Sequence, residues 1–127
     1  MDVVDFSNMP EFKMEWSDGP LAGERILKLT GPFTLSTVFD FQDSIRTHHP
    51  PLTIIDLTDV PYMDSAALGA LMGLHVSCQK DHRRYGLVGV SDRLKTLFRV
   101  SGVHTILVTF PTLADAETAM AGNAASA

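Results

Sequence analysis

The stretch Ile54–Leu74, IIDLTDVPYMDSAALGALMGL, decides the fold. It continues an apolar run that starts at Leu52 and ends at Leu57, which is typical of a central strand covered on both faces. Thr58–Pro61 has the composition of a loop, and Asp64 then opens a helix, because a carboxylate is a favoured N-cap. The helix is expected to pack on the sheet through residues at three- and four-residue spacing, which are Leu68, Leu71, Met72, His75 and Val76.

Two strands precede this unit. Glu11–Trp16 alternates polar and apolar residues, which predicts a half-buried strand. Ser17–Pro20 has turn chemistry, and Arg25–Thr30 predicts a second strand. We expect the two strands to pair as an antiparallel hairpin with a loose loop.

A helix is expected between this hairpin and the central strand. It covers Leu35–Ile45, and either Thr34 or Ser36 is expected to cap it. His48–Pro51 stops it, because proline cannot continue a helix and disfavours helical geometry in the residue before it. The apolar residues of this helix are Leu35, Val38, Phe39, Phe41 and Ile45, with Phe41 expected off the centre of the buried face.

Strands and helices continue to alternate in the second half of the chain. Tyr85–Val90 predicts a buried strand, and Ser91–Asp92 predicts the cap of a short helix that ends at Gly102 in the left-handed conformation. Thr105–Phe110 predicts the last strand, and Leu113–Met120 predicts a short amphipathic helix. The helix before Gly102 is expected to bury Leu94, Leu97, Phe98 and Val100.

The order of these elements predicts the fold class. Alternation of strands and helices after the hairpin calls for parallel strands joined by right-handed crossovers. We therefore predict an α/β domain with one mixed β-sheet of four to five strands and about four helices. The 127 residues suit a single domain, 1–127, in which 1–10 and 121–127 are expected to be flexible.

Composition narrows the classes of function. The formal net charge is −5, and a mildly acidic chain repels phosphates, so direct nucleic-acid binding is not expected. Cys78 is the only cysteine, which excludes an internal disulfide and a cysteine-based metal site. No apolar stretch is long enough to span a bilayer and the start of the chain lacks a secretory signal, so we expect no membrane insertion and a cytoplasmic location.

Ser65 stands out as a candidate regulatory site. It lies at the strand-to-helix junction, in the first turn of the expected helix, where backbone N–H groups lack partners and the helix dipole is positive. Both effects would support a phosphate on Ser65, and that phosphate would add about two negative charges beside Asp64. The residue types around it are small, including Ala66, Ala67 and Gly69, so a partner could approach the helix backbone closely.

The same residues carry a family resemblance. Asp56–Gly69, DLTDVPYMDSAALG, resembles the signature of STAS domains, and it is closest to that of bacterial anti-sigma-factor antagonists. Leu94–Val103, LKTLFRVSGV, is similar to a second segment of the family, and Leu29–Gly31 resembles the end of its second strand. The resemblance covers roughly residues 11 to 120 and rests on two separate segments in the right order, unlike a lone short motif.

The resemblance implies a function without catalysis or a cofactor. A serine-kinase anti-sigma factor sequesters a sigma factor, and the unphosphorylated antagonist binds that kinase and frees the sigma factor. The kinase phosphorylates the serine that maps onto Ser65, and a PP2C-type phosphatase resets it. The residues expected to contact the partner are Thr34, Met63, Asp64, Ser65, Ala66 and Gly69.

Two positions depart from the family pattern. Ala67 stands where the family usually carries glycine, and Thr34 stands where many members carry an aspartate near the serine. A hydroxyl in place of a carboxylate changes the charge around Ser65. These departures favour an alternative in which the domain is a non-phosphorylated subunit of a transporter or a sensing complex.

Other interpretations of single residues compete with the regulatory one. Ser65 has the chemistry of a plain helix cap, although Asp64 is the stronger candidate for that role. A hydrolase nucleophile at Ser65 is disfavoured, because the glycine-flanked elbow is absent around it. The five histidines match no metal motif. Asp56 is expected to point to an edge of the sheet or to a hydrogen-bond partner, and Lys80–Arg84 is expected to be a solvated helix end.

Overall fold

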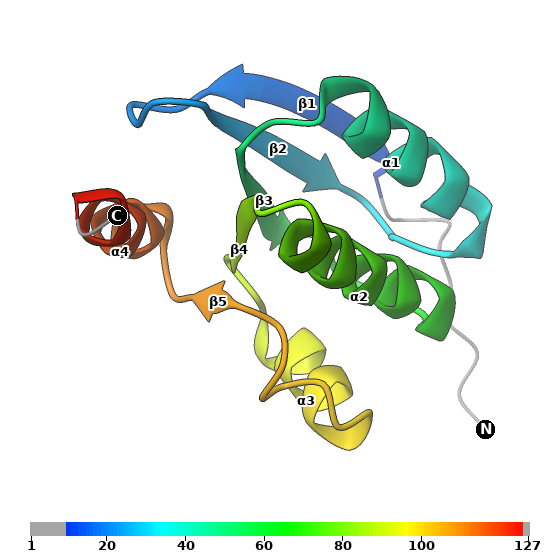
Figure 1. The fold of residues 1–127 in the computed structure, drawn as a ribbon. Helices are drawn as coiled ribbons and strands as arrows, with labels where there is room; N and C mark the ends of the chain where they lie inside the picture. The colour runs from blue at the N-terminus through cyan, green and yellow to red at the C-terminus, as the bar shows by residue number, and fades with distance from the viewer. Residues whose placement is uncertain (1–9, 126–127) are drawn as a thin grey trace, which may run out of the picture.

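The computed structural model describes residues 10–125, which form five strands and four helices (Figure 1). The expected order of elements is confirmed. The strands are β1 Lys13–Asp18, β2 Glu24–Thr30, β3 Leu52–Asp59, β4 Arg84–Val88 and β5 Thr109–Phe110. The helices are α1 Leu35–His48, α2 Ser65–Lys80, α3 Asp92–Val100 and α4 Leu113–Ala125.

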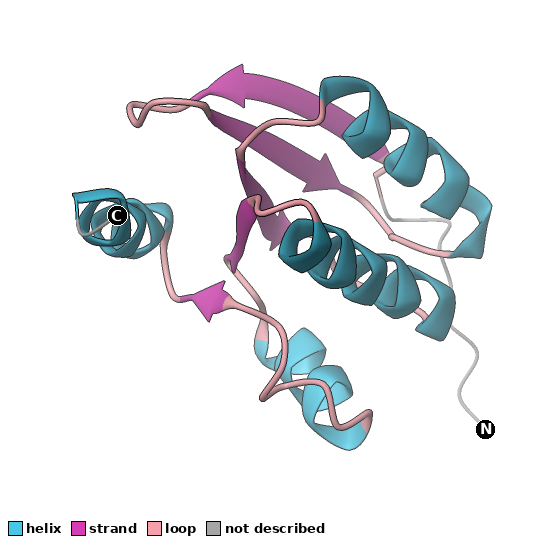
Figure 2. Cartoon of the chain, in the orientation of Figure 1, coloured by secondary structure: helices cyan, strands magenta, loops and turns pink. Residues whose placement is uncertain are grey.

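One mixed sheet organises the molecule, as the sequence predicts. The strands lie in the order β1-β2-β3-β4-β5, with β1 antiparallel to β2 and every other neighbouring pair parallel. Figures 1 and 2 show α1 and α2 on one side of the sheet and α4 on the other. Helices α1, α2 and α3 share one hydrophobic cluster with the sheet, and α4 packs in a separate cluster. The central strand β3 serves both, because Ile55 and Leu57 belong to the first cluster and Leu52 and Ile54 to the second.

Helix α1 buries a narrower face than its apolar residues suggest. Phe41 is 1% exposed and lies in the core, so the prediction that it sits off the centre of the face is wrong. Leu35 and Phe39, expected inside, are 61% and 69% exposed. Val38 and Ile45 lie on the same side of the helix as Phe41, and this is the side that packs into the core cluster with the hairpin and α2.

The buried face of α2 is also rotated from the expected one. Leu68 and Leu71 lie in the core as predicted, whereas Val76 is 57% exposed. Three small residues and one leucine complete the buried face, and these are Ala67, Ala70, Leu74 and Cys78. Small residues at these positions let α2 pack closely on α1 and on the sheet.

Three further expectations are corrected at the C-terminal half. Val100 is 80% exposed, because α3 buries Leu94 and Phe98 and packs Leu97 partly against the core, on a face that leaves Val100 out. The last strand is limited to Thr109–Phe110, since residues 104–106 form a turn, and Leu107, in the bend that follows, is buried. Arg83 and Arg84 are not a solvated helix end: the Arg83 side chain is 8% exposed, and Arg84 donates to the Met120 carbonyl.

The termini differ in part from the expectation of flexible ends. Helix α4 continues past Met120 to Ala125, so residues 121–125 are helical. The rest of the two segments expected to be flexible, 1–9 and 126–127, lies outside the described residues. No helix within residues 10–125 is long and apolar enough to cross a membrane.

Helix α4 meets the sheet through a pair of carboxyl groups. Glu24 in β2 is 3% exposed, and one oxygen of its carboxyl group accepts a hydrogen bond from the Leu21 N–H. The Oε2 atoms of Glu24 and of Glu117 in α4 are buried, and the two carboxyl groups interact with each other. Two carboxyl groups hydrogen-bond only if one carries a proton, so the contact raises the pKa of Glu117 to about 7, with burial and the Glu24 charge adding to the effect.

This pair predicts a pH-dependent stability. The pKa of Glu117 rises from 4.5 to about 7 on folding, so the folded state holds a proton that the unfolded chain has lost. The free energy of unfolding should therefore fall as the pH rises through this range, and Glu117→Gln should remove that fall. Urea unfolding of both proteins at several pH values measures the effect, and parallel pH profiles would contradict it.

Candidate functional site

The candidate site lies where the β2–α1 and β3–α2 loops meet. The two loops form one parallel bridge between Phe33 and Met63. The Phe33 N–H donates to the Tyr62 carbonyl over 3.0 Å, and the Asp64 N–H donates to the Phe33 carbonyl over 3.3 Å. These bonds join segments that are 30 residues apart and bring the starts of α1 and α2 together at the carboxyl ends of the strands.

The Asp64 carboxylate fixes both helix starts. Its Oδ1 accepts from the Ala67 N–H over 2.9 Å, which makes Asp64 the N-cap of α2, as expected. Its Oδ2 accepts from the Leu35 N–H in the first turn of α1, also over 2.9 Å. One carboxylate therefore satisfies an otherwise unpaired N–H group in each helix and holds the two first turns in a fixed relation.

Ser65 is the first residue of α2 and is exposed to solvent. Because Asp64 supplies the capping oxygen, the Ser65 hydroxyl is not needed for that role. Thr34, half-buried, precedes Leu35 and is the N-cap of α1, so the structure brings it to the same corner as Asp64 and Ser65. The Thr34 hydroxyl lies 2.9 Å from the Ser36 hydroxyl.

The other expected contact residues divide into surface and core. Gly69 is exposed, with no neighbouring atom within 4 Å of an added Cβ, and Ala66 is half-buried. Met63 is 3% exposed and belongs to the core cluster. The expectation that the Met63 side chain contacts a partner is therefore corrected: it anchors the loop that presents Asp64 and Ser65.

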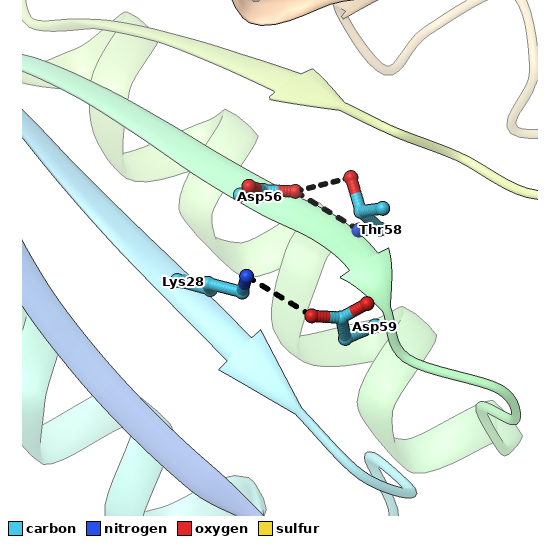
Figure 3. A network of polar contacts seen from close by, with 4 residues as sticks. All are labelled: Lys28, Asp56, Thr58 and Asp59. Atoms are coloured by element: carbon cyan, nitrogen blue, oxygen red, sulfur yellow. Dashed lines mark hydrogen bonds and ion pairs between the residues drawn. The ribbon is translucent and has the colours of Figure 1, made fainter.

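A polar network supports the same end of the sheet (Figure 3). Asp56 Oδ1 accepts from the Thr58 N–H over 2.9 Å and from the Thr58 hydroxyl over 2.6 Å, so Asp56 has the expected hydrogen-bond partner. Lys28 lies 3.0 Å from Asp59, and this hydrogen-bonded ion pair raises the pKa of Lys28. The Lys28–Asp59 pair ties the ends of β2 and β3 together just before the two loops that form the Phe33–Met63 bridge.

Sequence reasoning missed three residues around the site. The Arg93 guanidinium lies over the Tyr62 ring, 5.5 Å from its centroid, and places a positive charge beside the β3–α2 loop. Leu35 and Phe39 form an exposed apolar pair one helical turn apart on α1, next to the Asp64 contact. The only signal in the sequence is that Val38, Phe41 and Ile45 lie close together around the helix axis. This spacing indicates that the remaining two apolar residues of α1 face outward.

The described residues form no metal centre at the candidate site. Within residues 10–125, no three histidine, cysteine or acidic side chains come together in a way that could hold a metal ion. Cys78 is buried in the core, and His75 is bound to the Tyr85 hydroxyl at 2.7 Å. The corner presents the exposed Ser65 hydroxyl beside the fixed Asp64 carboxylate.

Removing the Asp64 carboxylate should destabilise the protein. We expect Asp64→Ala to lower the free energy of unfolding by roughly 1–3 kcal/mol, because it removes a helix cap and the bond to α1. Asp64→Asn retains one accepting oxygen, so its free energy of unfolding should fall by about half as much as that of Asp64→Ala. Chemical denaturation of the three proteins measures both losses, and equal stability of the alanine variant and wild type would show that the carboxylate does not join the helices.

Comparison with known proteins agrees with this architecture. The model of the STAS domain family matches residues 4–116. Over 53 residues the chain is 43% identical to an anti-sigma-B factor antagonist of Listeria monocytogenes, which is 42% of this chain and 46% of that protein. The chain therefore spans about half the length of this curated relative.

Solved structures share the fold. The anti-sigma factor antagonist SpoIIAA in its unphosphorylated form has a TM-score of 0.70 at 19% identity, covering 88% of this chain and 97% of that one. Its phosphorylated form from Bacillus has a TM-score of 0.63 at 18% identity, covering 87% and 99%. A sulfate transporter family protein of Wolinella succinogenes has a TM-score of 0.67 at 26% identity, covering 74% and 81%. The match to the family model spans nearly all of the sheet and its helices, and the chain belongs to the STAS domain family.

Proposed function

We propose that this protein is an anti-sigma factor antagonist that binds a serine-kinase anti-sigma factor and is switched by phosphorylation of Ser65. The observation that carries the proposal is the placement of Ser65, which is exposed at the start of α2 while Asp64 alone supplies the cap. A kinase can reach an exposed hydroxyl without unfolding the domain. The name of the Listeria monocytogenes relative supports the same role.

Phosphorylation would change charge and leave the fold in place. A phosphate carries about 1.5 to 2 negative charges at neutral pH, and the start of α2 favours an anion. The same phosphate would lie next to the Asp64 carboxylate, which the Ala67 and Leu35 N–H groups hold in place. A partner that docks on this corner would have to desolvate both negative groups, so it would bind the phosphorylated chain more weakly.

The docking surface follows from the exposed residues around Ser65. Gly69 lies one turn along α2 with open space beside it, which lets a partner backbone approach the helix. Ala66 and Thr34 are half-buried and flank Ser65 on the two helices. Because the kinase brings the ATP and a PP2C-type phosphatase removes the phosphate, this chain needs no cofactor of its own.

Partner binding provides the first test. The purified chain is titrated with the serine-kinase anti-sigma factor encoded in the same genome, and saturable one-to-one binding is expected. Gly69→Arg should abolish binding without unfolding the chain, because an added side chain meets open space here and blocks the partner. Gly122→Arg is the control, since Gly122 also has open space but lies on α4, which packs in the separate cluster of the sheet.

A second function has one observation in its favour. The sulfate transporter family protein of Wolinella succinogenes shares the fold at 26% identity, above the 19% of unphosphorylated SpoIIAA. Its matched length exceeds that of the Listeria monocytogenes relative, although its identity is lower than the 43% of that shorter match. If the chain binds a candidate transporter subunit and no serine kinase, the alternative of a non-phosphorylated transporter subunit replaces our proposal.

A further inference from the structure

A cavity lies between α1 and α2 near the C-terminal ends of the two helices. Its volume is about 320 Å³, which is room for roughly ten water molecules and falls within the range of small-molecule sites. Ser65 starts α2 and Ser77 lines the cavity near the other end of this helix. The cavity is therefore separate from the Ser65 corner.

Its lining combines an apolar wall with basic groups. Phe41, Ile45 and Leu74 supply the apolar wall. Arg46, His49 and Arg83 supply nitrogen donors, Gln42 and Ser77 add neutral polar groups, and Asp81 supplies the one carboxylate. Arg46 also forms an ion pair with Asp43, which lies outside the lining.

Arg83 is the unusual member of this lining. Its side chain is 8% exposed, and its Nη2 has a single ionic contact, at 3.5 Å from Asp81 Oδ2. Its Nε and Nη1 are buried with no hydrogen-bond partner. A buried guanidinium with unpaired donors is costly, and an anionic oxygen in the adjacent cavity would supply the missing acceptor.

We propose that this cavity binds a small organic anion, a carboxylate or phosphate monoester with an apolar body, through Arg83. The apolar wall receives the body of the ligand, and the Arg83 side chain shifts on binding so that Nε and Nη1, which are closed to solvent in this structure, reach the anionic group. Arg46, which is also paired with Asp43, adds a second positive charge to the lining, and His49 adds a ring nitrogen. Such a ligand would sit between α1 and α2 and thereby contact both helices that Asp64 joins at their other ends.

The test uses two aromatic anions as probes, phenyl phosphate and benzoate, with benzyl alcohol as the neutral probe. Each is titrated into the ¹⁵N-labelled full chain while amide chemical shifts are recorded. At least one anion should give saturable shifts confined to the cavity-lining parts of α1 and α2, and benzyl alcohol should not. No saturable shift with either anion, or equal shifts with benzyl alcohol, would overturn the proposal.

Variants locate the site. Gly73→Leu fills the cavity, because Gly73 lines it and has open space for a side chain, and it should raise the dissociation constant at least tenfold. Gly69→Leu makes the same change one turn earlier on α2, outside the lining, and should bind as wild type does. Equal binding by the two variants would contradict the assignment.

Arg83→Met separates a ligand role from a structural one. Methionine has a similar length, and replacing a poorly paired buried charge with an apolar group is often neutral or stabilising. The variant should keep or raise the free energy of unfolding and should lose anion binding at least tenfold. Retained binding, or a variant that no longer folds, would show that Arg83 serves the structure instead.

Discussion

Ser65→Asp is expected to weaken binding to the serine-kinase anti-sigma factor by about 10- to 100-fold, or roughly 1.4–2.8 kcal/mol. The added carboxylate would stand beside Asp64, which the Leu35 and Ala67 N–H groups already hold at the docking corner. Aspartate carries less charge than phosphoserine, so the effect of the true phosphate should be larger. A binding titration of wild type and variant measures the ratio.

Two further variants control this result. Ser65→Ala removes only an exposed hydroxyl, so it should fold normally, bind the kinase and resist phosphorylation. Ser101→Asp adds the same charge at another exposed serine, at the end of α3, and should bind as wild type does. If Ser65→Asp and Ser101→Asp weaken binding equally, net charge and not the Ser65 corner is responsible.

Leu71→Ala is expected to lower the free energy of unfolding by about 2–5 kcal/mol. Leu71 is fully buried where α2 packs on the sheet, so truncation leaves a cavity that the surrounding side chains cannot fill. Val76→Ala, on the same helix, should change stability by no more than about 0.5 kcal/mol, because Val76 is 57% exposed. Urea denaturation measures the free energy of unfolding of both variants. Equal losses in the two would mean that α2 does not bury the face on which Leu71 lies.

The sheet could be predicted because its strands depend on local pattern. Alternation in the first strand and the apolar run from Leu52 to Leu57 each report the burial of a whole strand. The short β5 shows the limit of this reasoning, since residues 105–108 have a strand-like composition but lie outside the strand, where Leu107 is buried in a bend after a turn. Burial of one side chain does not require an extended backbone.

The buried face of a helix was harder to predict, because more than one side of the helix carries apolar residues. On α1, five apolar residues cover more of the helix circumference than the sheet and α2 can contact. The sequence alone does not determine which of these residues are buried. Phe41 faces inward and Phe39 outward because of packing across the whole domain. The exposed pair Leu35 and Phe39 is therefore a product of the tertiary structure.

The site was predicted in its local parts and missed in its long-range ones. Cap chemistry identified Asp64 and placed Ser65 in the first turn of α2, and both positions are confirmed. The bond from Leu35 to Asp64 spans 29 residues, and no local rule predicts it. The same holds for the Phe33–Met63 bridge, which buries Met63 and takes it out of the expected contact surface.

Mass analysis of the wild-type chain after incubation with the serine-kinase anti-sigma factor and ATP tests the central proposal most directly. We expect one added phosphate, located by fragmentation at Ser65, and weaker binding of the phosphorylated chain to the same kinase. Ser65→Ala should gain no phosphate. A phosphate on another residue, continued modification of Ser65→Ala, or unchanged binding after phosphorylation would contradict the account.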